Sequence, residues 1–250
     1  MPRWLEAGGW GLLAGSALLL GALIGYRVPI AQRVIATVMA FGAGVLLSAV
    51  SFELIADAHE RAGLVPTAVG AVTGAVAYTA ANIWLARRGA RHRKRSGEQQ
   101  VSESEQPGSG TAIAVGALLD GVPESVVIGA SLLSGGAVSV VTVAAVFVSN
   151  VPEGLSSAAG MVRAGRSGRY VFGLWTAIAV VSGLAALAGY TLLGDAPAAV
   201  LAGITALAAG AILAMIADTM IPEAFEQAHL LVGLVTVLGF LTAFTLSRLG

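Results

Sequence analysis

The sequence predicts an all-α protein, a polytopic bundle of about eight transmembrane helices. Hydrophobic residues make up 56% of the chain and charged residues only 11%, whereas a soluble domain carries roughly 25% charged residues. The mean hydropathy is +0.84. The 33 glycines favour close packing between membrane helices. This composition excludes an ordinary soluble domain, so the expected partner is a lipid bilayer and not a nucleic acid.

Eight apolar runs are long enough to serve as spans, since crossing a hydrocarbon core takes roughly 20 apolar residues. The predicted spans are about 8–26, 33–56, 65–87, 111–134, 138–162, 170–193, 197–221 and 229–248. The runs lack the alternation that membrane strands would show. A cleaved signal peptide is the alternative interpretation of the first run.

One polar segment divides the chain into spans 1–3 (residues 1–86), a linker (87–110) and spans 4–8 (111–250). The linker begins with the basic run RRGARHRKRS and continues with glutamates. Its low apolar content predicts a disordered, solvated segment in which His92 is only one more solvated group.

Basic residues predict the orientation, because cytoplasmic loops carry the excess of Lys and Arg. Eleven of the 14 basic residues fall in alternate loops. They are Arg27, Arg33, Arg87, Arg88, Arg91, Arg93, Lys94, Arg95, Arg163, Arg166 and Arg169. We therefore predict an integral protein of the cell (inner) membrane, with both termini outside and the linker in the cytoplasm.

Acidic residues inside the apolar runs carry the functional signal. They are Glu53, Asp120, Glu124, Glu153 and Asp218. No Lys, Arg or His lies deep within a predicted span. An ionised carboxylate in a bilayer costs about 2.5–3.5 kcal/mol on insertion scales, so these acids need protons, water or bound cations. An inorganic cation is the simplest compensation.

The spacing of the polar residues concentrates this signal on two spans. Asp120 and Glu124 are four residues apart and share a helix face, and Asn150 and Glu153 are three apart. Ser149 lies four residues before Glu153. We predict that these five residues line one cation site, with Glu53 and Asp218 as secondary ligands or as acids along the path.

A proline precedes three of the glutamates, and inside a helix proline frees a backbone carbonyl one turn earlier. The pairs are Pro123-Glu124, Pro152-Glu153 and Pro222-Glu223. A freed carbonyl beside side-chain oxygens is a plausible ion-coordinating element. For Glu223, a hydrated place at the membrane interface is the alternative to a role in the site.

At these residues the chain resembles the ZIP (Zrt-, Irt-like) family of divalent metal transporters, as a divergent prokaryotic-type member. The segments that carry the resemblance are Asp120-Gly121-Val122-Pro123-Glu124-Ser125 and Ser149-Asn150-Val151-Pro152-Glu153-Gly154. The resemblance covers nearly the whole chain. It implies a 3+2+3 arrangement of spans, uptake toward the cytoplasm, and metal ligation by Glu124, Asn150 and Glu153.

Departures from the family pattern bear on which ion is carried. Asp120 and Ser149 stand where the family has histidines, Gly121 stands where it has another ligand, and the chain has no cysteine. A site made only of oxygen favours hard cations. The expected cargo is therefore a divalent ion of the manganese, iron or zinc class, with no prosthetic group.

Two other functions are the alternatives to transport. A transport-inactive ZIP-like protein, acting as a metal sensor or structural partner, would account for the missing histidines. An enzyme is not expected, because His59-Glu60 lacks a second histidine four residues on and Ser156 is not in a G-x-S-x-G motif. A homodimer formed through helix faces stays open.

Overall fold

The computed structural model describes residues 2–135 and 138–249, and in that part the chain is helical with no strand. Eight helical runs are long and apolar enough to cross a membrane, which confirms the predicted fold class. The elements are α1 (Arg3–Arg27), α2 (Gln32–Ala49), η1 (Val50–Ile55), α3 (Ala56–Ala62), α4 (Leu64–Leu85), η2 (Ala86–Ala90), α5 (Ser109–Gly135), α6 (Val140–Arg163), α7 (Gly168–Leu193), α8 (Ala198–Met215), η3 (Ile216–Met220), α9 (Ile221–Ala228) and α10 (Leu231–Leu249).

Two of the spans that extend beyond their predicted apolar runs do so through a π-helical turn that contains an acid. The second runs over Gln32–Ala62 through a π-helical turn, η1, and the seventh over Ala198–Glu226 through η3. Pro222 does not end the seventh span, because it lies in the first turn of α9, where a helix tolerates the missing N–H. The acids are Glu53 in η1 and Asp218 in η3, whereas the third π-helical turn, η2, contains none.

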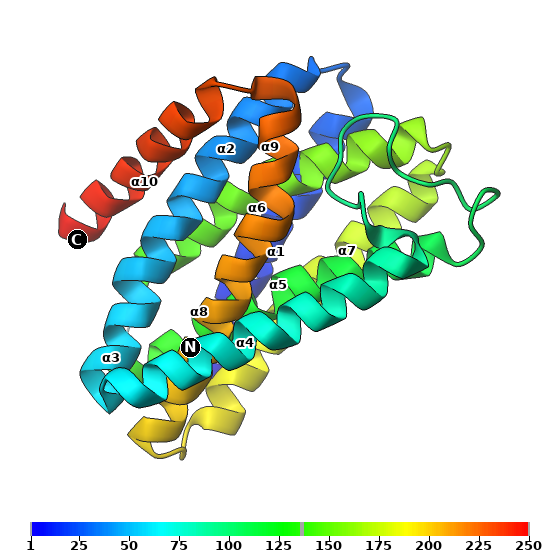
Figure 1. The fold of residues 1–250 in the computed structure, drawn as a ribbon. Coiled ribbons are helices and arrows are strands. Elements are labelled where there is room, and N and C mark those ends of the chain that lie inside the picture. The colour runs from blue at the N-terminus through cyan, green and yellow to red at the C-terminus, as the bar shows by residue number, and fades with distance from the viewer. Residues whose placement is uncertain (1, 136–137, 250) are drawn as a thin grey trace.

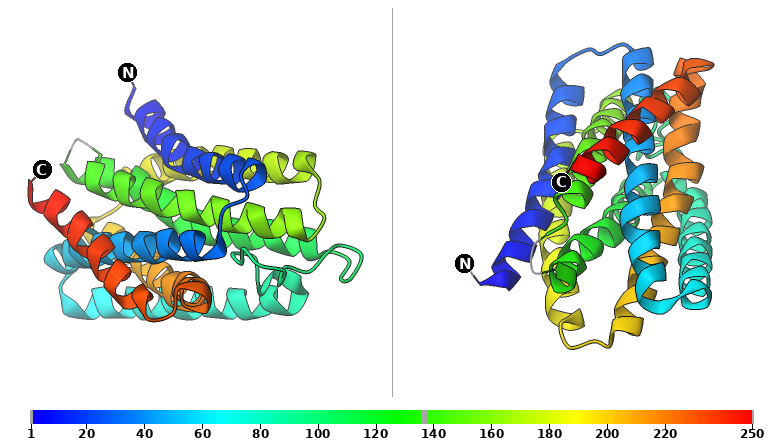
Figure 2. Two further views of the ribbon diagram at one scale, coloured as in Figure 1. Left: turned by 90° about the horizontal axis from the view of Figure 1, so that it is seen from above. Right: turned by 90° about the vertical axis from the view of Figure 1, so that its left-hand side faces the viewer.

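The helices pack in corresponding pairs around α5 and α6 (Figures 1 and 2). Helix α2 packs against α10 as α8 packs against α4, and α1 packs against α6 as α7 packs against α5. In an apolar stretch of 18 residues, only 17% of residues are buried in the spans of α4 and α10, whereas 67% are buried in α6. Helices α4 and α10 therefore present apolar side chains to lipid, while α6 lies in the interior.

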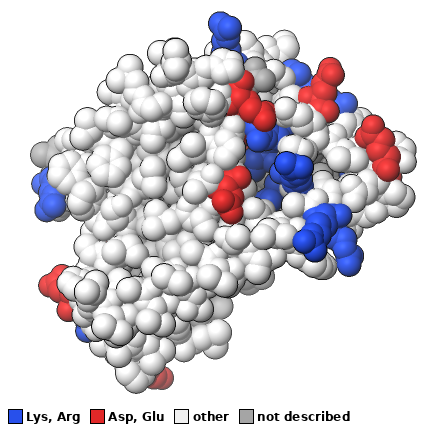
Figure 3. All heavy atoms as spheres, viewed as in Figure 1, with Lys and Arg blue, Asp and Glu red and all other residues white. Residues whose placement is uncertain are grey.

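The chain termini lie at one end of the bundle and the segment between η2 and α5 lies at the other (Figure 2, left). This segment, residues 91–108, is the non-helical part of the predicted linker, and we call the end that carries it the linker end. Charged side chains gather at that end, whereas most of the remaining visible surface is uncharged (Figure 3).

Glycines bring the backbones of α4 and α8 into contact. A Cβ added at Gly210 on α8 would clash with the carbonyl oxygen of Ala71 on α4, and one at Gly74 would clash with that of Leu207. Each glycine thus accommodates a backbone carbonyl of the other helix, the packing that small residues allow in membranes.

We expect Gly210→Ala to lower the free energy of unfolding by about 1–3 kcal/mol, because the added methyl group must push α8 away from α4. Gly203→Ala on the same helix is the matched control, since no atom lies within 4 Å of a Cβ there. The control should be neutral or stabilising by up to about 1 kcal/mol. Thermal unfolding of both variants in detergent checks this, and equal melting temperatures would contradict the packing.

Candidate functional site

Helices α5 and α6 carry three acids into the interior of the bundle. Asp120 and Glu124 on α5 are each 2% exposed, and Glu153 on α6 is 5% exposed. Pro123 and Pro152 lie inside these two helices, as predicted from their sequence. Three buried carboxyl groups in an apolar bundle require compensating charge, protons or hydrogen bonds.

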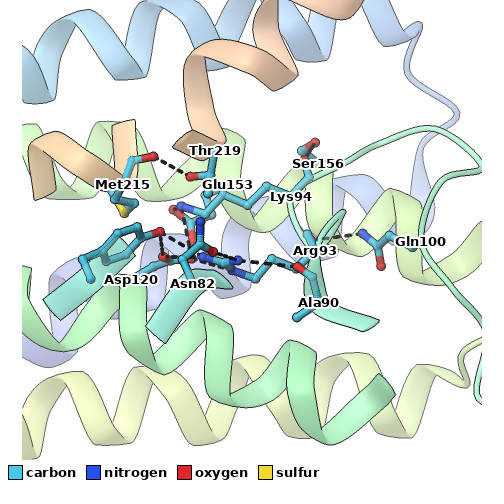
Figure 4. A network of polar contacts seen from close by, with 11 residues as sticks. Asn82, Ala90, Arg93, Lys94, Gln100, Asp120, Glu153, Ser156, Met215 and Thr219 are labelled. Carbon is cyan, nitrogen blue, oxygen red and sulfur yellow. Dashed lines mark hydrogen bonds and ion pairs between the residues drawn. The ribbon is translucent and has the colours of Figure 1, made fainter. Parts of the chain in front are cut away.

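Arg93 of the linker supplies part of that compensation by reaching Asp120 (Figure 4). Its Nε lies 3.0 Å from Asp120 Oδ2 and its Nη2 lies 2.9 Å from Oδ1. This is the bidentate geometry in which a guanidinium group binds a carboxylate. The Tyr78 hydroxyl also donates to Oδ1, at 2.7 Å, and Asn82 Oδ1 accepts from Arg93 Nη1 at 2.7 Å. Helix α4 thus completes the pocket that holds the guanidinium.

Lys94 lies between the acids of α5 and α6. Its Nζ is 2.7 Å from Glu153 Oε2 and 3.3 Å from Asp120 Oδ2. The hollow lined by Arg93, Lys94, Asp120 and Glu153 leaves no room for a water molecule. One ammonium group therefore holds together a carboxylate from each of the two central helices.

The linker thus differs from the solvated, disordered segment predicted from its composition. Arg93 and Lys94 are each 3% exposed, and Gln100 is also buried. The Gln100 side-chain amide donates to the carbonyls of Arg93, Arg95 and Ser157 at 3.0–3.1 Å. Ion pairs to buried carboxylates, together with these hydrogen bonds, offset the cost of removing two cations from water.

Glu223 and Glu226 on α9 form a second acidic contact with the linker. Arg95 Nε lies 3.4 Å from Glu223 Oε2, and its Nη1 lies 2.6 Å from Glu226 Oε2. The backbone N–H of Ser96 donates to Glu223 Oε1 at 2.9 Å, and the Ser156 hydroxyl lies 3.0 Å from the same oxygen. Glu223 is only 2% exposed, which rules out the alternative of a hydrated interfacial group.

Farther along the linker, Glu103 anchors it to α7 and to the start of α5. Arg166, just before α7, lies 2.7 Å from Glu103 Oε2, and the Gly110 N–H donates to the same oxygen at 3.0 Å. The hydrogen bond from Arg166, aided by the N–H groups of Gly108 and Gly110, lowers the pKa of Glu103 to about 2. Glu103 is therefore ionised, and its contacts hold, throughout the physiological pH range.

Glu124 differs from its two neighbours, because its Oε1 is buried and has no hydrogen-bond partner among the described residues. It lies one helical turn after Asp120 on the same face of α5. Arg93 and Lys94 offset two of the three central carboxylates, so Glu124 is the one of these three that has no basic partner among the described residues.

The neutral residues predicted as ligands are buried but bonded elsewhere. Asn150 Nδ2 donates to the Ala14 carbonyl of α1 at 3.0 Å, and the Ser149 hydroxyl donates to the Val146 carbonyl at 2.9 Å. The side-chain carbonyl of Asn150 is not used in that bond. The Asn150 bond joins α6 to α1, whereas the Ser149 bond stays within α6.

Glu53 and Asp218, predicted as secondary ligands, take no part in the ion pairs of Arg93 and Lys94. Glu53 accepts hydrogen bonds from Ser247 at 2.5 Å and from Ser139 at 3.4 Å, so it joins the end of α10 to the start of α6. Asp218 is exposed on η3. No group of three acids or histidines within the described residues is arranged to hold one metal ion.

Sequence reasoning missed the residues that complete the network, namely Tyr78, Asn82, Arg93, Lys94, Ser96 and Ser156. The available signal was the charge balance. The spans hold several acids and no deep cation, while the adjoining linker holds a dense basic run. A basic segment beside unpaired buried acids is a candidate to fold back onto them.

The fold and the site together define an eight-span integral membrane protein in which two interior carboxylates, Asp120 and Glu153, are paired with cations of its own linker. Comparison with models of known protein families gives no match, and comparison with curated proteins gives no significant relative.

Proposed function

We propose that this chain is a permease for a divalent metal cation of the manganese, iron or zinc class. The observation that carries the proposal is the Lys94 ammonium held between Asp120 and Glu153, at the place where α5 and α6 present their acids. Carboxylates that bind a buried ammonium from two helices have the charge and the convergence that a cation needs. Glu124 adds a buried carboxyl oxygen with no protein donor among the described residues.

The packing of the helices supports a transport role for this position. Buried acids inside membrane spans are costly and mark ion paths in many membrane proteins. Corresponding helix pairs on either side of a central pair, as α2–α10 and α4–α8 lie here, suit alternating access around a fixed site. The resemblance of the two Pro-Glu segments to those of ZIP transporters agrees with this reading. We propose uptake toward the cytoplasm, with the linker on the cytoplasmic side.

The test is ion uptake by the purified protein in liposomes, measured separately for Mn²⁺, Fe²⁺, Zn²⁺, Co²⁺ and Cd²⁺. We expect Glu153→Gln to lower the initial rate for the preferred ion on the order of 10- to 100-fold, because one ligand charge is lost. Glu60→Gln is the control, since that acid is exposed on α3 and should retain the wild-type rate.

A transport-inactive protein, acting as a metal sensor or structural partner, is the second candidate. It is favoured by one observation, the neutralisation of Asp120 and Glu153 by the chain's own cations. Folded protein that carries none of the five ions, with or without its linker cations, would establish that candidate and end the permease proposal.

A further inference from the structure

We infer that the linker is a tethered occupant of the cation site, in which Arg93 and Lys94 take the place of the cargo and must withdraw before a metal ion can bind. This inference rests on the proposed function, because it concerns the regulation of the same site. The ammonium of Lys94 and a bound divalent ion would use the same oxygens of Asp120 and Glu153. The two states therefore exclude one another.

Helix α6 is shaped to receive the linker backbone. Ser156, Ser157 and Gly160 follow Glu153 on one helical face, at spacings of three, four and seven residues. The Ser156 hydroxyl lies 2.5 Å from the Lys94 carbonyl, and the Ser157 carbonyl accepts from Gln100 at 3.0 Å. A Cβ at Gly160 would clash with the Arg95 carbonyl. Small residues on this face thus give the linker backbone a close fit.

Helix α5 is shaped to receive the side chain of Arg93. A Cβ on Gly116, one turn before Asp120, would lie 2.5 Å from Arg93 Cδ. The absence of a side chain at this position opens the route by which the guanidinium reaches Asp120. Gly116 on α5 and Gly160 on α6 therefore both leave room for the linker.

The ionic contacts between the linker and the helices indicate that the linker docks reversibly. A permanent structural core would use apolar residues at lower cost, because burying an ion pair is often no better than burying hydrophobic residues of the same volume. Here the buried cations belong to a connecting segment, and Arg95 and His92 beside them are only partly buried. The segment can return its cations to water when another cation takes the carboxylates.

Lys94 is the only lysine in the sequence. The rate of cleavage by a lysine-specific endoproteinase therefore measures how accessible Lys94 is. Cleavage yields two fragments, residues 1–94 and 95–250. We expect the full-length wild-type protein in detergent to be cut slowly, and at least about tenfold faster with saturating Mn²⁺. Arg93→Ala should be cut fast without Mn²⁺. Gly116→Leu should behave in the same way, because it blocks the guanidinium without changing a charge.

Two controls accompany this assay. The double variant Lys94→Arg, Ser104→Lys moves the only lysine to an exposed linker position and should be cut fast with or without Mn²⁺. Gly173→Leu places the same side chain as Gly116→Leu at a position with no atom within 4 Å and should be cut as slowly as the wild type.

The outcomes separate this inference from the proposed function. The inference that the linker occupies the cation site would be overturned by either of two results. One is wild-type cleavage as fast as that of the Ser104→Lys control, and the other is slow cleavage that Mn²⁺ leaves unchanged. Uptake into liposomes is the second measurement, and Arg93→Ala should raise the initial rate of Mn²⁺ uptake about tenfold. Cleavage controlled by Mn²⁺ with no uptake by any variant supports the occupant and defeats the permease. Equal uptake by Arg93→Ala and wild type defeats regulation by the linker and leaves the permease standing.

Discussion

Asp120→Leu should release the linker from the bundle. The Asp120 carboxylate accepts hydrogen bonds from Arg93 and Tyr78 and is paired with Lys94. Removing one partner of a buried ion pair costs about 3–5 kcal/mol when the other charge stays buried. The linker avoids that cost by carrying Arg93 and Lys94 into water. A cost of about 3 kcal/mol corresponds to a shift of about 100-fold in the population of the released linker.

The measurement is the rate of cleavage after Lys94 in Asp120→Leu, which we expect to rise by about 100-fold. In the double variant Asp120→Leu, Arg93→Leu, the cleavage rate should fall back toward the wild-type value, because an apolar pair can replace the ion pair. Asp57→Leu is the control, since it breaks a solvent-accessible ion pair with Arg61 on α3. Slow cleavage of Asp120→Leu would show that this pair contributes little to linker docking.

The fold was predictable because the bilayer imposes a simple rule on the sequence. Runs of about 20 apolar residues must form helices that satisfy their own backbone hydrogen bonds, and the eight spans follow from that rule. The extension of the second span to Ala62 was less visible. Its last turns carry Asp57, His59 and Glu60, which are polar enough to end an apolar run without ending the helix.

The central acids were also identifiable, since a buried carboxylate in an apolar helix is conspicuous. Asp120, Glu124 and Glu153 lie in the interior as their positions suggested. Glu53 and Asp218 were harder to place, because a single acid in a span gives no partner that fixes its direction. The structure places Glu53 against the hydroxyls of Ser139 and Ser247, contacts that only the packed bundle brings together.

The position of the linker was not predictable from its composition. A segment rich in Arg, Glu, Ser and Gly is ordinarily solvated, because it has little apolar surface to bury. This linker docks because its cations and N–H groups meet carboxylates that lie far away in the sequence. Ser96 and Glu223 are 127 residues apart, and Lys94 and Glu153 are 59 apart. Such pairings depend on the packing of α5, α6 and α9, which hydropathy does not reveal.

Glu124→Met should abolish uptake of the preferred ion and at the same time stabilise the protein. The wild-type Oε1 is buried without a hydrogen-bond partner among the described residues, and an unsatisfied buried polar group costs about 1–3 kcal/mol. Methionine has a similar length and fills the same space without a polar group. We therefore expect a gain of about 1–3 kcal/mol in the free energy of unfolding, seen as a higher melting temperature in detergent.

The opposite signs of the two effects test whether the carboxyl group of Glu124 is kept for function. Side chains that lower stability and persist at a site are typical where activity needs them. Glu124→Gln is the matched variant, because it keeps a polar group of the same shape that cannot ionise. It should lose uptake without gaining the stability of Glu124→Met. If Glu124→Met melts at a lower temperature and transports normally, the carboxyl group serves packing, and the cation path must run past Asp120 and Glu153 without it.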